Sequence, residues 1–148
     1  MVKVIAKYMV FMLLVSGLLT VPYAVPAAAH TGSCTVTGNT WGPSFPNGGT
    51  LYGSGNVDCG VVHSKMYIRV TLEVQQFNPP GWISLSGTTK EKTLYNVSSI
   101  SKQTSHGCQV QGGSFTYRVR IFYKAWSNGQ LNHSDTVWRG QETHPCVP

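Results

Sequence analysis

Residues 112–126, with the sequence GGSFTYRVRIFYKAW, decide the fold of this chain. Alternate residues in this stretch are apolar, and those between them are mostly polar, with Phe122 as the exception. A period of two over this length predicts a half-buried β-strand, with one face on a core and one in water. The polar face carries three cations, Arg118, Arg120 and Lys124.

The same alternation recurs in residues 65–77, which predict a second long strand. An Asn-Pro-Pro-Gly turn follows it, so residues 66–86 are expected to form a hairpin. Weaker patterns predict further strands at 33–40, 50–59, 82–86, 93–100 and 135–140, with loops at 41–49 and 101–107. About seven short strands without an amphipathic helix after the first residues indicate an all-β protein. We expect an antiparallel β-sandwich of the immunoglobulin or fibronectin type.

The first 29 residues have the features of a signal peptide. Lys3 and Lys7 precede an apolar run at 8–19, and Ala27-Ala28-Ala29 fits a cleavage site. The alternative, an uncleaved anchor, is disfavoured because spanning a bilayer takes about 20 apolar residues. We therefore expect a secreted, extracellular domain of residues 30–148 with no membrane span.

The formal net charge of the whole chain is +6, and removing the two lysines of the leader leaves about +4. This modest, scattered charge favours contact with anionic surfaces such as wall polymers or acidic lipids. Nucleic acid is not expected as a partner, because the chain has no basic run and no nucleic-acid-binding motif.

Four cysteines follow the leader, and an even number in an exported chain predicts two disulfides with three possible connectivities. We favour Cys34–Cys59 with Cys108–Cys146, because each pair then brackets a plausible strand pair. The spacings contain no CxxC, which argues against a structural metal site.

Part of this pattern resembles a known group of proteins. Cys108, then Gly113-x-Phe115-x-Tyr117-Arg118-Val119-Arg120, and the closing Cys146 are similar to small exported two-disulfide β-sandwich proteins of Gram-positive bacteria. The resemblance covers about the last third of the chain. It implies a fold and a compartment, and it transfers no activity and no functional residues.

Enzymatic signatures are missing from the sequence. It contains no GxSxG, HExxH or GxxxxGK motif, and His133-Ser134-Asp135 are adjacent residues that cannot form a catalytic relay. The chain is therefore expected to be non-enzymatic, with no cofactor.

His30 is the one candidate for metal binding. If cleavage follows Ala29, its free amine and its imidazole form a chelate that suits Cu(II). Together with a second histidine this resembles the histidine brace of copper-binding sandwich proteins. The possible partners are His63, His106, His133 and His144. The alternative is that His30 is simply the residue at which cleavage occurs.

Aromatic residues and cations supply the candidate binding surface. Trp41 and Tyr52 flank a loop rich in proline and glycine, and Tyr67 alternates with polar residues, so these rings are expected near solvent. Trp82 and Trp138 lie within short strands and are expected in the core.

The cations Arg118, Arg120 and Lys124 form a row that can contact an anionic polymer, to which Arg69 adds if the two long strands share a sheet. The alternative is a solvated face that prevents edge aggregation. These features favour a secreted non-enzymatic binding module for an extracellular or cell-wall polymer or a protein target. The alternatives are a secreted inhibitor or antimicrobial effector, and a copper-binding protein that uses His30.

Overall fold

The computed structural model of the chain describes residues 33–44, 48–109 and 113–148. This part is all-β: it contains six strands and no helix, and hence no helix that could cross a membrane. The strands are β1 (Thr35–Trp41), β2 (Gly49–Phe77), β3 (Pro80–Ser84), β4 (Lys90–Cys108), β5 (Phe115–Ser127) and β6 (Gln130–His144). They pair antiparallel in one sheet, as expected for the fold class. The expected leader, residues 1–29, lies outside the described residues.

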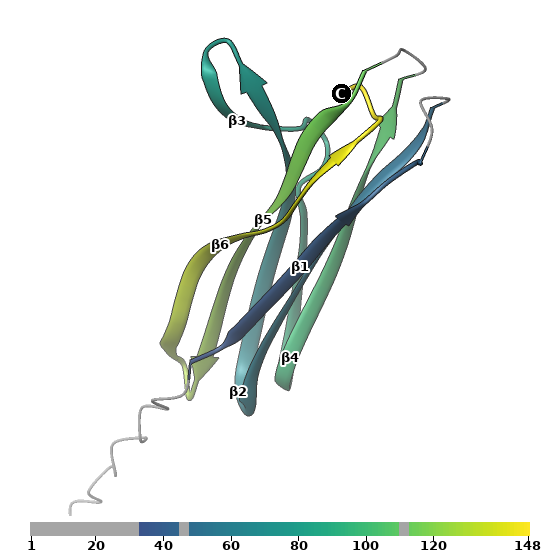
Figure 1. Cartoon of the computed structure of the whole chain (residues 1–148). Helices are drawn as coiled ribbons and strands as arrows, with labels where there is room; N and C mark the ends of the chain where they lie inside the picture. The colour runs from purple at the N-terminus through teal and green to yellow at the C-terminus, as the bar shows by residue number, and fades with distance from the viewer. Residues whose placement is uncertain (1–32, 45–47, 110–112) are drawn as a thin grey trace, which may run out of the picture.

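The long strand β2 is the centre of the sheet, and it folds back on itself. A Cβ atom built on Gly53 would lie 2.8 Å from Leu72, and one on Gly55 would lie 3.0 Å from Val70. In a straight strand, residues so far apart in sequence would be separated by about 50 Å or more. The reversal coincides with the interruption of the β2–β4 ladder between Asp58 and His63, and Figure 1 shows β2 and β4 turning at the same end of the molecule.

Because β2 and β4 bend together, one continuous sheet becomes two facing layers. The first half of β2, residues 49–58, pairs with β1 on one side and with the end of β4 on the other. Its second half, residues 63–77, pairs with β5 on one side and with β4 and β3 on the other, and β6 extends β5. The sheet thus curls around its own core (Figure 1).

The expected number of about seven strands is wrong for the described residues, where six occur. The segments 50–59 and 65–77 were expected as separate strands, yet both belong to β2 because the ladder continues beyond the bend. The loop expected at 101–107 is also wrong. These residues form the end of β4, where they pair with the first half of β2. The hairpin expected at 66–86 is confirmed as β2–β3.

The core follows the alternation of the two long strands. Tyr117, Val119 and Ile121 of β5 are fully buried. So is the matching apolar row of β2, which comprises Met66, Ile68, Val70, Leu72 and Val74. These residues pack against Leu51, Val57 and Ile100 from the other layer. Glycines at positions 38, 53 and 55 face this core, and their missing side chains let the two layers approach closely.

Hydrogen bonds from side chains to the backbone close the curled sheet where β1 meets β6. Thr40 Oγ1 donates a hydrogen bond to the Gly140 carbonyl oxygen at 2.8 Å, and Arg139 Nε donates to the Val36 carbonyl oxygen at 3.2 Å. Gly140 has a φ of 60°, and a Cβ there would lie 2.6 Å from the backbone of Asn39. This crossing therefore requires glycine, both for its conformation and for its size.

Two disulfides fix the ends of the domain with the expected pairing. Cys34–Cys59 ties the start of β1 to β2, and Cys108–Cys146 ties the end of β4 to the C-terminal tail. The Tyr117 hydroxyl donates a hydrogen bond to the carbonyl oxygen of Cys146. Burial raises the pKa of Tyr117 to about 12, so this hydroxyl stays protonated and holds the tail.

Candidate functional site

Trp41 and Tyr52 form a stacked aromatic pair on the outside of the first layer. They are direct neighbours across the β1–β2 ladder. Their ring centroids lie 5.5 Å apart, with 15° between the ring planes. Trp41 keeps 41% of its surface exposed. A partly exposed ring held parallel to a second ring offers a flat apolar surface that is already ordered.

Beyond this pair, the same outer face carries rows of short polar side chains. The next outward row contains Asn39, Ser54 and Gln103, and the row after it contains Thr37, Asn56 and Ser101. These side chains point outward because the alternate glycines, Gly53 and Gly55, face the core. We call this surface, from the aromatic pair through both rows, the polar groove face.

The polar groove face contains an open groove of about 360 Å³. All six side chains of the two rows line it. Two lysines, Lys92 and Lys102, also line the groove, and none of its lining residues is acidic. Hydroxyl and amide groups both donate and accept hydrogen bonds, so the groove can satisfy a ligand with many hydroxyl groups.

The expected cationic row lies on the opposite, second layer, where two of its cations share one buried carboxylate. Glu73 is 4% exposed and is contacted by two arginines. Arg118 Nη2 lies 2.8 Å from Glu73 Oε2, and Arg120 Nη1 lies 3.2 Å from Glu73 Oε1. A buried carboxylate needs such partners, because leaving it unpaired would cost several kcal/mol. Arg118 and Arg120 therefore have a structural task.

Arg118 is further enclosed by aromatic rings. Its guanidinium carbon lies 4.0 Å from the Trp82 ring centroid and 5.3 Å from that of Trp138. Both tryptophans were expected in the core. This expectation is wrong for Trp138, which is 46% exposed. Trp82 is half-buried. Arg118 accounts for the exposed position of Trp138, because a cation over the face of an indole stabilises that ring at the surface.

Tyr67 and Lys124 lie on this second layer as well. Tyr67 is half-buried and packs edge-on against Phe122, with ring centroids 6.1 Å apart. Burial raises the pKa of Tyr67, with smaller contributions from Glu91. Lys124 Nζ lies 5.4 Å from the Phe122 ring centroid, and Arg69 covers the same ring at 5.0 Å. Arg69 thus does join the row, as expected if the two long strands share a sheet.

The six candidate binding residues are therefore divided between two surfaces. Trp41 and Tyr52 come together on the polar groove face. The second surface, which we call the cationic face, carries Tyr67, Arg118, Arg120 and Lys124. The candidate metal ligand His30 lies outside the described residues. Of its possible partners, His63 and His133 lie side by side, whereas His144 lies elsewhere and bonds to Thr40 Oγ1 through Nε2 at 3.1 Å.

Sequence reasoning missed the two polar rows of the groove. Residues 101–107 were expected as a loop, although the alternation of Ser101, Gln103 and Ser105 with Ile100, Lys102 and Thr104 was a weak strand signal. Their position beside Ser54 and Asn56 depends on the β2–β4 ladder, which is not encoded locally. No protein-family model matches the chain, and no curated protein matches it either.

Proposed function

We propose that this protein is a secreted, non-enzymatic binding module that holds a glycan strand, such as a cell-wall polymer, on its polar groove face. The observation that carries the proposal is the stacked Trp41–Tyr52 pair next to rows of hydroxyl and amide side chains. A sugar ring has an apolar face and a rim of hydroxyl groups. The aromatic pair can stack on the apolar face of the sugar, and the polar rows can hydrogen-bond to its hydroxyl groups.

The remainder of the chain fits this role. Two disulfides suit an oxidising, extracellular location, in line with the expected leader. A small sheet that curls around one core and is fastened at both ends presents its outer faces with little freedom, which lowers the cost of binding. We further propose that the fold is a variant of the immunoglobulin-like sandwich in which one bent ribbon joins both layers.

The polar groove face is a better candidate than the cationic face. Arg118 and Arg120 are already paired with Glu73, so an anionic polymer would have to compete with that ion pair. Lys92 and Lys102 of the groove can still contact acidic groups of a substituted glycan. We therefore expect binding that depends mainly on Trp41 and only weakly on salt.

The test is retention of the oxidised, secreted protein on purified cell walls, chitin, cellulose and starch, at low and at high salt. We expect retention on at least one of these polymers that persists at high salt. Loss of retention in high salt would assign binding to cations instead, because ionic strength screens exposed charges.

Retention on none of the polymers would contradict the glycan proposal. Growth inhibition or enzyme inhibition without any polymer would then favour the alternative of a secreted inhibitor or antimicrobial effector. Capture of a defined extracellular protein would favour a protein target.

A further inference from the structure

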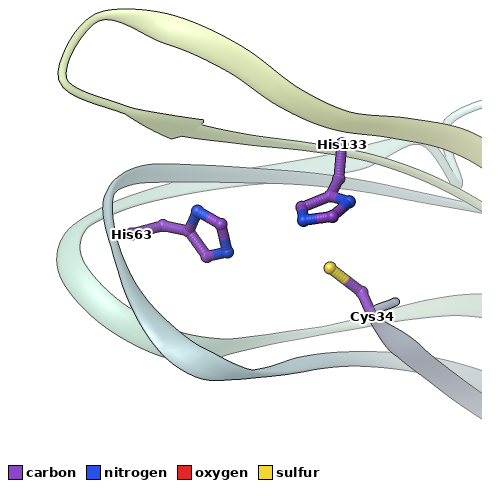
Figure 2. Close-up of side chains that lie close together, drawn as sticks. All are labelled: Cys34, His63 and His133. Atoms are coloured by element: carbon purple, nitrogen blue, oxygen red, sulfur yellow. The ribbon is translucent and has the colours of Figure 1, made fainter. Parts of the chain in front are cut away.

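Two histidines and a disulfide meet at the end of the molecule where β2 bends. His63 lies in β2 just after the bend, His133 lies in β6, and Cys34 lies immediately before β1. One nitrogen from each histidine and the Cys34 sulfur all lie within 4.8 Å of one another. Figure 2 shows the two imidazole rings and the sulfur directed toward a common space.

The surroundings orient the two imidazoles as ligands. His63 is fully buried, and its Nδ1 atom lies 3.0 Å from Ser127 Oγ. A hydrogen bond at one ring nitrogen fixes the orientation of the ring, as is usual for histidines around protein-bound metals. The Nε2 atom of His133 is buried and has no hydrogen-bond partner among the described residues. Such an atom is costly unless something binds it.

The sulfur has a different role from the nitrogens. Cys34 is bonded to Cys59, so its sulfur is not a thiolate and forms a wall of the space. None of the three members of the cluster is an acid. A pair of imidazoles without carboxylates disfavours calcium and magnesium, which require oxygen ligands. It suits late first-row transition metals.

We propose that His63 and His133 bind one copper ion in the secreted protein. Copper(II) binds more tightly than the other divalent first-row metals at a given nitrogen site. Metal–imidazole bonds of about 2.0–2.1 Å require the two donor nitrogens to be within about 4.2 Å. The two nitrogens lie within 4.8 Å of each other, so a movement of less than about 1 Å brings them to this distance.

Two imidazoles leave coordination positions open on a copper(II) ion. Water can fill them. The copper site is independent of the glycan proposal, because it lies at the bend of β2 and its test uses no polymer.

The experiment is titration of the tag-free, oxidised, secreted protein with Cu²⁺, followed by calorimetry and by electron paramagnetic resonance. We expect one ion per chain, with hyperfine coupling from at least two imidazole nitrogens. His63→Gln and His133→Gln should each weaken Cu²⁺ binding at least about tenfold. His106→Gln is the matched control, because His106 lies outside the cluster, and it should bind Cu²⁺ as the wild type does.

The spectrum of the wild-type protein keeps the test valid even if a variant fails to fold. A signal without imidazole nitrogens would overturn the proposal. So would Cu²⁺ binding that is abolished by His30→Gln yet unchanged in both cluster variants, because it would assign the ion to the amino-terminal chelate alone. Loss of binding in both cluster variants, with the His106→Gln control unchanged, would support the site.

Discussion

Trp41 stacks on Tyr52 across the β1–β2 ladder, with 5.5 Å between their ring centroids and 15° between their planes. The pair lies next to two rows of hydroxyl and amide side chains on the same face of the sheet. Apolar surface and hydrogen-bonding groups thus lie next to each other on one face of the sheet. This arrangement is the basis for assigning ligand binding to the first layer of the curled sheet.

Glu73 should be a major source of stability in the second layer. Glu73→Ala removes the carboxylate that pairs with both Arg118 and Arg120. We expect the free energy of unfolding to fall by about 2–3 kcal/mol, as measured by urea unfolding. This is less than for a fully buried pair, because both arginines reach solvent.

Glu91→Ala is the control for the Glu73 variant. Its carboxylate lies 3.9 Å from Arg69, and both side chains are exposed. We expect a change of no more than about 0.5 kcal/mol. Equally small losses for the two variants would show that the Glu73 network does not stabilise the fold.

Gly55 should be required for the contact between the two layers. In Gly55→Ala, the new Cβ would lie 2.9 Å from Ile121 Cγ1 and 3.0 Å from Val70 Cγ2. Overpacking of this kind costs about 1–3 kcal/mol, which a urea titration resolves. Gly107→Ala in β4 is the control, because its Cβ meets nothing within 4 Å. If both variants were as stable as the wild type, β2 would not fold back as described.

His144 should make stability depend on pH. Burial lowers its pKa below the usual 6.5, although the nearby Glu142 carboxylate opposes this shift. The unfolded chain therefore takes up a proton at a higher pH than the folded protein does. The free energy of unfolding should fall as the pH drops below about 6.5, and this contribution should stop changing below the folded-state pKa.

Urea unfolding between about pH 8 and about pH 5 measures this effect. His144→Gln should flatten the fall below pH 6.5, whereas His106→Gln should retain it. A wild-type slope that persists unchanged in His144→Gln would assign the pH dependence to other groups.

The strands could be predicted from the sequence because their signal is local. The alternation around Tyr117 and Ile121, the turn after Phe77 and the cysteine positions each depend on neighbouring residues, and all appear in the structure. The reversal of β2 could not be predicted in the same way. It occurs within a ladder that β2 and β4 continue on both sides of the bend.

The candidate sites show the same limit. Trp41 and Tyr52 could be proposed because they flank one loop, but Gln103 joins Ser54 only through long-range pairing. His63 and His133 come together from β2 and β6, far apart in the sequence. The pairing of Arg118 and Arg120 with Glu73 also escaped prediction, because Glu73 alternates with polar residues and its pattern predicts a solvated side chain.

The most direct test of glycan binding by the polar groove face compares Trp41→Ala with Lys124→Ala on the polymer that retains the wild-type protein. Binding isotherms at high salt should show Trp41→Ala at least about tenfold weaker, as for a truncated aromatic anchor. Lys124→Ala should match the wild type. Unchanged affinity in Trp41→Ala, or a loss confined to Lys124→Ala, would contradict the assignment of the site to the first layer.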